Sequence, residues 1–268
     1  MLPSIPSKTR KTKNRATPIP DSHPSRRKTI KTTRRDTHAS RFVYPAIIVF
    51  DVDGVLVETR DSFQRTTLET VQFFTKKRVT LRELHTWKNR PGFNDDWKLC
   101  TTWVQDLGFN FSFNQIKTKY QELYWGKEGK GNVLGERWLL PPATLRRLGR
   151  RADLAIFTGR YYREMDYTLD RNKVRGLFTE IMTVERAKRP KPAPDGLLKI
   201  LGERNPATAI YLGDNIDDAL AAQAAGVRFV GVLPRNSEER RQRAARLKEL
   251  GALTILGHVS ELEAWLKR

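Results

Sequence analysis

Short apolar runs alternate with longer amphipathic segments through most of the chain. The first run, Ala46-Ile47-Ile48-Val49-Phe50, is continuous and rich in β-branched residues, as expected for a strand covered on both faces. Similar runs follow at 154–157, 181–184, 208–212, 228–232 and 253–256. These runs predict the strands of a buried sheet.

Helix-length segments lie between the later strands, at 162–173, 194–201, 217–225 and 238–250. Strands that alternate with helices are typical of an α/β fold with a doubly wound, Rossmann-like parallel sheet. Asn236 and Glu239 predict the start of the helix at 238–250, and Ser260-x-x-Glu263 predicts the start of the last helix.

One long interval breaks this alternation between the first strand and the second. It contains four predicted helices, at 63–76, 81–88, 95–107 and 114–125, with Trp87, Trp97, Trp103 and Trp125 spread among them. An insertion of this length with its own aromatic residues predicts a small all-helical domain. We therefore divide the folded part into an α/β core, 43–61 and 142–268, and a helical domain, 62–141.

The N-terminal 42 residues differ from the rest in composition. They hold twelve Lys or Arg, only two acids, twelve Ser or Thr and five Pro, with almost no large apolar residue. Such a segment cannot bury enough surface to offset the entropy of ordering, so we predict a disordered basic tail. It could be a solvated extension or a mis-assigned start, an organelle transit peptide, or a tether for nucleic acid or membrane.

The formal charge of +20 favours anionic partners without choosing among nucleic acid, acidic membranes and phosphorylated metabolites. Cys100 is the only cysteine, which excludes an internal disulfide and a thiolate zinc site. No apolar stretch is long enough to span a bilayer. We expect a soluble cytoplasmic protein without a membrane partner, or an organellar one if the tail is a transit peptide. A monomer and a homodimer both stay open.

Polar residues directly after the predicted strands are candidates for chemistry, because ligands bind at the carboxyl ends of parallel strands. Asp51 and Asp53 follow the first strand and point to the same side of an extended segment. Two such carboxylates beside a buried strand are costly unless a cation or a reaction uses them. Thr158 and Gly159 follow the second strand and could hold phosphate oxygens, although a simple turn has the same sequence.

Two further segments come after later strands. Lys191 lies among prolines ahead of a helix, and by itself it could be an ordinary surface lysine. Asp214, Asp217 and Asp218 follow the strand at 208–212 and could merely begin a helix. Because they face the first acidic pair across the sheet edge, they favour a hard-cation site with oxygen ligands suited to Mg²⁺.

These motifs, in this order, resemble those of the haloacid dehalogenase superfamily. The resemblance rests on Asp51-Val52-Asp53-Gly54-Val55-Leu56, on Thr158, on Lys191 and on Gly213-Asp214 with Asp218-Ala219, and it covers the chain from the first strand to about residue 226. The insertion after the first strand is similar to the helical cap of the phosphoglycolate phosphatase-like branch. Residues 88–97 resemble a signature of a small uncharacterised subgroup of that branch.

The resemblance implies a mechanism. Asp51 is the implied nucleophile, which forms an aspartyl-phosphate, and Asp53 is the implied general acid and base. The implied Mg²⁺ ligands are the carboxylates of Asp51 and Asp214 and the backbone carbonyl of Asp53. Asp218 would bind a metal-bound water or orient Lys191; Asp217 receives no role.

Phosphate binding is implied for Thr158, the Gly159 amide and Lys191. Candidate specificity residues in the cap are Lys88, Arg90, Asn94 and Asp95, although the segment at Asn94 could instead simply begin a helix.

The sequence thus predicts a Mg²⁺-dependent phosphatase acting on a small phosphorylated metabolite. Asp53 disfavours a dehalogenase, which normally lacks an aspartate at that position. A phosphomutase of the same superfamily stays open. A different class, a nucleic-acid-binding protein, could act only through the basic tail, and neither zinc-finger spacing nor a stacking module supports it.

Overall fold

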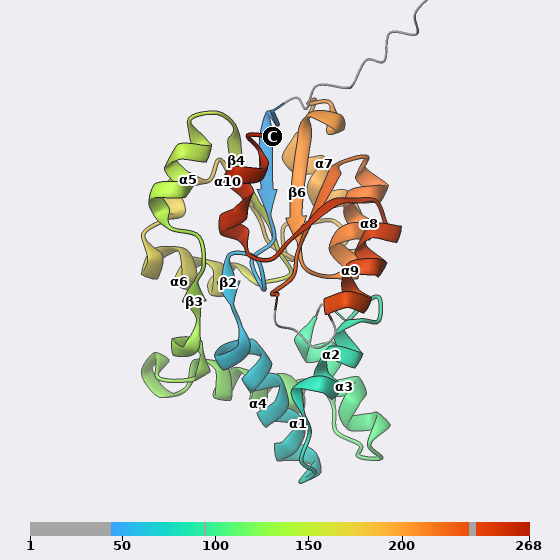
Figure 1. Cartoon of the computed structure of the whole chain (residues 1–268). Helices are drawn as coiled ribbons and strands as arrows, with labels where there is room; N and C mark the ends of the chain where they lie inside the picture. The colour runs from blue at the N-terminus through green and yellow to red at the C-terminus, as the bar shows by residue number, and fades with distance from the viewer. Residues whose placement is uncertain (1–43, 94, 236–239) are drawn as a thin grey trace, which may run out of the picture. The chain divides into compact units, whose positions relative to one another are not determined.

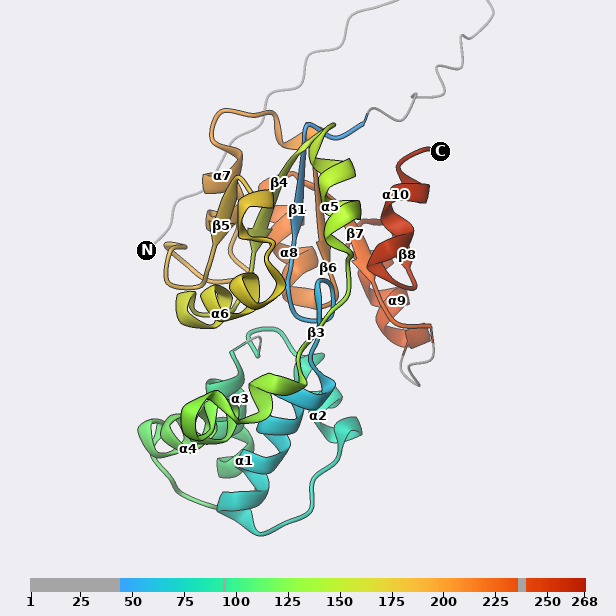
Figure 2. The same cartoon turned by 90° about the vertical axis from the view of Figure 1, so that its left-hand side faces the viewer.

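A computed structural model describes residues 44–93, 95–235 and 240–268 of the chain. Its main sheet, drawn in Figure 1 and with its strands labelled in Figure 2, has six parallel strands in the order β5-β4-β1-β6-β7-β8. Their bounds are Ile47–Phe50 for β1, Asp153–Phe157 for β4, Glu180–Met182 for β5, Ala209–Gly213 for β6, Arg228–Val232 for β7 and Ala252–Leu256 for β8. The central strands β1 and β6 are fully buried, which explains their uninterrupted apolar sequence.

Helices cover both faces of this sheet. Side chains at alternate strand positions, such as Ile48 and Phe50, pack with α5, α6 and α10, whereas Ile47 and Val49 pack with α7, α8 and α9. The bounds are Pro142–Gly149 for α5, Tyr162–Asn172 for α6, Asp195–Leu201 for α7, Ile216–Ala225 for α8, Arg240–Glu249 for α9 and Leu262–Trp265 for α10. The prediction of a doubly wound α/β fold is confirmed.

The chain leaves the core after β2 and returns through β3, which pair antiparallel as a two-stranded connection. Between them lies the helical insertion, residues 59–136, beyond the carboxyl ends of β1 and β6 (Figure 2). The bounds are Val57–Glu58 for β2, Arg137–Trp138 for β3, Arg65–Thr75 for α1, Leu81–Lys88 for α2, Asp96–Asp106 for α3 and Phe113–Trp125 for α4. The insertion has its own apolar core, to which Leu84, Trp103 and Tyr120 belong.

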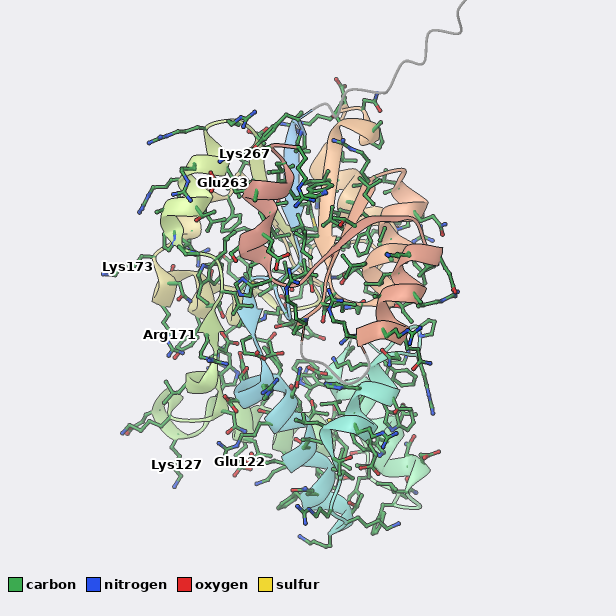
Figure 3. All side chains as sticks on the ribbon, viewed as in Figure 1. Glu122, Lys127, Arg171, Lys173, Glu263 and Lys267 are labelled. Carbon is green, nitrogen blue, oxygen red and sulfur yellow. The ribbon has the colours of Figure 1, made fainter. Side chains whose placement is uncertain are left out.

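Several contacts join the insertion to the core. Arg171 of α6, labelled in Figure 3, donates hydrogen bonds to the backbone oxygens of Val133 and Leu134, both at 3.2 Å. The rings of Trp97 in α3 and Tyr161 at the start of α6 stack with centroids 4.5 Å apart. These contacts hold the insertion above the strand ends where the sequence places its acids.

Some local predictions differ from the structure. The last helix does not begin with Ser260 as its cap; a short 3₁₀ turn, Val259–Glu261, comes first, and the His258 side chain accepts the Ser260 N–H. The predicted strand at 181–184 is shorter, because the Val184 N–H donates to the Arg160 carbonyl. The tail, Asn94, Asn236 and Glu239 lie outside the described residues. Within the described ranges, none of the helices combines the length and the apolar character that crossing a bilayer requires.

Candidate active site

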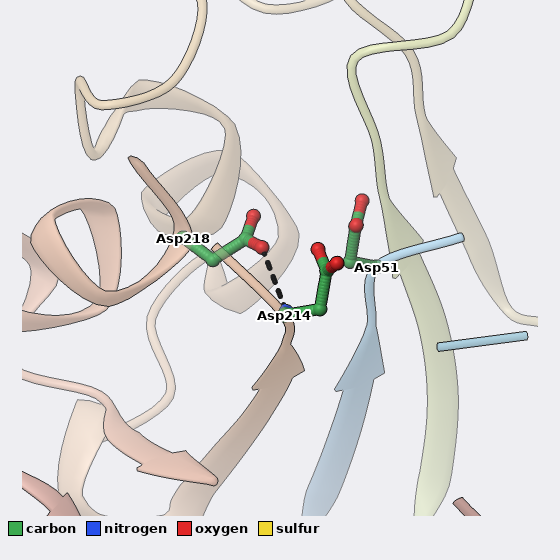
Figure 4. A group of neighbouring side chains, drawn as sticks. All are labelled: Asp51, Asp214 and Asp218. Carbon is green, nitrogen blue, oxygen red and sulfur yellow. Dashed lines mark hydrogen bonds between the residues drawn. The ribbon is translucent and has the colours of Figure 1, made fainter. Parts of the chain in front are cut away.

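Asp51 comes directly after β1, and its side chain is almost fully buried beside two other acids. Carboxylate oxygens of Asp51, Asp214 and Asp218 lie within 4.8 Å of one another (Figure 4). Asp214 follows β6, the neighbouring strand, and Asp218 is on the first turn of α8. The parallel register of β1 and β6 therefore brings acids from two distant segments to one point.

Lys191 supplies the positive charge at the centre of this cluster. Its Nζ lies 2.8 Å from Oδ1 of Asp51 and 2.6 Å from Oδ1 of Asp218. Burial acts to lower the pKa of Lys191, but the carboxylates of Asp218 and Asp51 outweigh it and raise that pKa. The ammonium group therefore stays charged next to the candidate nucleophile.

Tyr211 of β6, which the sequence analysis did not single out, forms hydrogen bonds with both Lys191 and Asp218. Its hydroxyl donates to Oδ1 of Asp218 at 2.7 Å and accepts from Lys191 Nζ at 2.9 Å. Asp218 in turn accepts the backbone N–H groups of Asp214 and Asn215 through Oδ2. Asp218 thus contacts both Lys191 and the loop at Asp214, as its implied role of orienting Lys191 requires. Its other implied role, binding a metal-bound water, stays a prediction.

The carboxylate charge at this site exceeds the cationic charge that faces it. Burial raises the pKa of Asp51 well above its ordinary value, with further contributions from Asp218, Asp53 and Asp214, against the opposing effect of Lys191. Burial also raises the pKa of Asp214 to about 6, although the Arg243 guanidinium opposes this. A divalent cation bound to these carboxylates would lower the pKa of both Asp51 and Asp214 again.

The arrangement fits such a cation in chemistry and in space. The donors are all carboxylate oxygens, the ligand type that Mg²⁺ prefers. Gly54 turns the loop after Asp51 at a φ of +78°, and a Cβ at this position would lie 2.5 Å from Oδ2 of Asp214. The glycine thus keeps the space beside the acids open.

Asp53 lies at the same strand end but is not part of the three-acid cluster. Its side chain is 39% exposed and pairs with Arg160, 2.7 Å from Oδ1. With Asp214 and Lys88 it lines a cavity of about 80 Å³ between the core and the insertion. A group bound there would meet Asp53 from the side of the insertion.

Thr158 and Gly159 line a second, larger cavity of about 640 Å³ together with Lys191. The Thr158 hydroxyl oxygen accepts the backbone N–H of Arg160 at 3.2 Å. The structure thus brings Thr158, Gly159 and Lys191 to one opening, next to the insertion residues Gly92 and Asp95.

The four candidate specificity residues have different surroundings. Lys88 forms an ion pair with Asp96 and lines the smaller cavity. Asp95 begins α3 by accepting the N–H groups of Trp97 and Lys98, and it also lines the larger cavity.

Arg90 is exposed, lies over the Trp87 ring and lines neither of these two cavities, so its stacking contact accounts for its position. Asn94 lies outside the described residues.

Sequence reasoning also missed Arg160 and Arg243. Arg160 directly follows the Thr158-Gly159 pair, so its place after a strand end was an available signal. Arg243 lies on α9 and donates to the backbone oxygen of Asp214 at 2.7 Å. Nothing in the sequence distinguishes it from the other arginines of that helix.

Comparisons with known proteins give a family model and several relatives. The family model for haloacid dehalogenase-like hydrolases matches residues 142–232. Over 200 residues the chain is 30% identical to an imidazoleglycerol-phosphate dehydratase from Phytophthora nicotianae, a match covering 69% of this chain and 43% of that protein. The chain thus spans less than half the length of that relative. It is 24% identical to pyrophosphatase PpaX from Bacillus velezensis, over 69% of this chain and 82% of PpaX.

Solved structures share the fold at low sequence identity. A predicted phosphoglycolate phosphatase from Haemophilus somnus matches with a TM-score of 0.65 and 18% identity, covering 82% of this chain and 97% of that one. YfnB from Bacillus subtilis, solved bound to magnesium, matches with a TM-score of 0.59 and 14% identity, covering 84% and 100%. Residues 142–232 thus match the haloacid dehalogenase-like hydrolases, and the chain shares its fold with solved structures that include a predicted phosphoglycolate phosphatase.

Proposed function

We propose that the protein is a Mg²⁺-dependent phosphatase that hydrolyses a small phosphate monoester through an aspartyl-phosphate on Asp51. The observation that best supports this proposal is the buried contact of Asp51 with Lys191, at the edge of the sheet where Asp214 and Asp218 also lie. Similarity to a pyrophosphatase and to a predicted phosphoglycolate phosphatase supports phosphoryl chemistry. A phosphorylated metabolite is the proposed substrate, and the cytoplasm the proposed compartment.

In the first step a carboxylate oxygen of Asp51 attacks phosphorus and the bond to the leaving oxygen breaks. Asp53 gives its proton to the departing alkoxide, which leaves as an alcohol. In the second step Asp53 takes a proton from water as the water oxygen attacks phosphorus. The bond between phosphorus and Asp51 then breaks, inorganic phosphate leaves, and both aspartates return to their starting states.

Positive charge must compensate the phosphoryl group during both steps. Lys191 contacts Asp51 directly and opens onto the cavity that holds Thr158, whose hydroxyl can donate to a phosphoryl oxygen. Mg²⁺, held by Asp51, Asp214 and the Asp53 carbonyl, would supply further charge neutralisation when bound. The similarity to YfnB, solved with magnesium, supports this choice of metal.

Hydrolysis of p-nitrophenyl phosphate by the purified protein, with Mg²⁺ or with EDTA, tests the proposal. We expect turnover only with the metal, loss of turnover in Asp51→Asn, and retained turnover in the surface control Asp153→Asn. Acid-quenched wild type should carry a phosphoryl group on the peptide that contains Asp51. Normal turnover of Asp51→Asn would exclude this nucleophile.

A panel of phosphate esters, scored by kcat/KM, then identifies the substrate class. Product analysis with a sugar phosphate distinguishes hydrolysis from a phosphomutase reaction, because a mutase returns an isomeric sugar phosphate rather than inorganic phosphate.

A further inference from the structure

Arg160 is a fully buried cation that contacts the proposed proton-transfer residue. Its Nε and Nη2 lie 2.9 Å and 2.7 Å from the same oxygen, Oδ1 of Asp53. Its Nη1 lies 2.8 Å from Oε1 of Glu136, whose side chain is 3% exposed. Arg160 therefore lies between two carboxylates, one at the active site and one where the insertion returns to the core.

Other groups fix the guanidinium in place. Nη1 also donates to the Thr168 hydroxyl at 2.8 Å, and this hydroxyl donates to Oε2 of Glu136 at 2.8 Å. The Tyr124 hydroxyl, from α4 of the insertion, donates to Oε1 of Glu136 at 2.7 Å. The Phe63 ring lies under the guanidinium carbon at 4.6 Å. Moving Arg160 would break its contacts with Thr168 and Phe63 as well as its two ion pairs.

The way in which two guanidinium nitrogens of Arg160 contact Asp53 matters for proton transfer. Both nitrogens that reach Asp53 meet Oδ1, so the contact engages one carboxylate oxygen and does not involve Oδ2. Two charge-assisted donors fix the position of Oδ1 more firmly than one donor would. The second oxygen can then face the leaving group at a fixed orientation.

We propose that Arg160 is the positioning residue for Asp53: it holds Oδ1 and presents Oδ2 for proton exchange, while Glu136 holds Arg160. This inference rests on the proposed phosphatase function. Through Glu136 and Tyr124, the insertion then influences the orientation of the proton-transferring carboxylate. A purely structural ion pair is the alternative reading of the same contacts, and the two differ in how activity depends on the leaving group.

The test compares the phosphoryl-transfer step for p-nitrophenyl phosphate and for glycerol phosphate, measured by rapid quench with Mg²⁺. A nitrophenolate leaves without a proton, whereas an alkoxide needs one. We expect Arg160→Met to slow transfer from glycerol phosphate by about 10²–10⁴-fold and from p-nitrophenyl phosphate by less than about tenfold. Asp53→Asn should show the same selectivity, and adding Arg160→Met to it should bring little further loss.

Two variants separate positioning from folding. Arg160→Met leaves the buried Glu136 carboxylate without its cation, so Arg160→Met combined with Glu136→Gln is prepared as well. Glu136→Gln alone keeps Arg160 and should produce a smaller loss with the same leaving-group selectivity. The control is Arg175→Met, which removes a surface arginine paired with Asp166 and should leave both rates unchanged.

Equal losses on both esters in the folded Arg160 and Glu136 variants would overturn the positioning role, as would losses that multiply with those of Asp53→Asn. If wild type transfers no phosphoryl group, or if Asp53→Asn shows no leaving-group selectivity, the proposed function itself fails. If Asp53→Asn is selective and the Arg160 variants are not, only this inference fails.

Discussion

The carboxylate of Asp217, in the core, accepts the backbone N–H of Gly92, in the helical insertion, at 3.1 Å and 3.2 Å from its two oxygens. Asp217 is buried on the first turn of α8, one residue before Asp218. Gly92 has a φ of +82° and lines the larger cavity beside Thr158. This contact gives Asp217, which the sequence left without a role, a place in closing the site.

Asp217→Asn should weaken the docking of the insertion loop on the core. A hydrogen bond to a charged acceptor contributes about 1.5–3 kcal/mol, so we expect KM to rise by about one to two powers of ten, with a smaller change in kcat. Steady-state kinetics on the best ester of the panel measures this. Asp195→Asn is the matched control, because Asp195 also lies on a first helical turn but pairs with Arg189. An unchanged KM in Asp217→Asn would show that the contact does not help binding.

Gly54→Ala should disable the proposed metal site. A Cβ there would lie 2.5 Å from Oδ2 of Asp214, so the carboxylate must move. We expect a weaker affinity for Mg²⁺ by at least about tenfold, measured by calorimetry. Gly129→Ala is the control: its φ of +74° brings a similar backbone penalty, but nothing lies within 4 Å of the added Cβ. Equal affinities in the two variants would contradict the proposed metal position.

The strands and helices could be predicted closely, because buried positions in this fold are occupied by apolar residues whose spacing is visible in the sequence. The strand β1 has four buried residues in succession. The helix α4 begins at Phe113, one residue before the predicted start, and the Ser112 side chain caps it. Sequence reasoning failed where tertiary contacts decide. Nothing local indicates that His258 rather than Ser260 caps the last turn.

The acids of the site were predictable from their place after the strands, whereas their partners were not. Arg160 and Tyr211 are ordinary residues of a turn and a strand until the fold brings them to Asp53 and Lys191. Lys191 itself was identified through the family resemblance, since an isolated lysine between prolines carries no chemical signal. Pairing across more than a hundred residues depends on the sheet order, which a single sequence does not state.

Lys191→Met should cost stability as well as activity. The substitution leaves the buried carboxylates of Asp51 and Asp218 without their cation, and breaking such a pair costs about 3–5 kcal/mol. Urea denaturation without metal measures the free energy of unfolding. Combining Lys191→Met with Asp218→Asn should recover part of the loss, and the exposed Lys199→Met serves as the control. A single variant as stable as wild type would show that the pairing is not a net stabilising interaction.

Glu164→Gln should stabilise the protein increasingly as the pH rises. Burial raises the pKa of Glu164 from 4.5 to about 8, even though its carboxylate accepts the Tyr161 N–H. Between these values the unfolded chain releases a proton that the folded chain retains, so the wild type loses stability as pH rises towards 8. Gln cannot ionise, so the variant lacks this loss, and its advantage over wild type should grow by a few kcal/mol between pH 5 and pH 8. Urea midpoints at the two pH values measure the change, with the exposed Glu122→Gln as the control for removing one carboxylate. A difference that is the same at both pH values would mean that Glu164 is already ionised in the folded protein at pH 5.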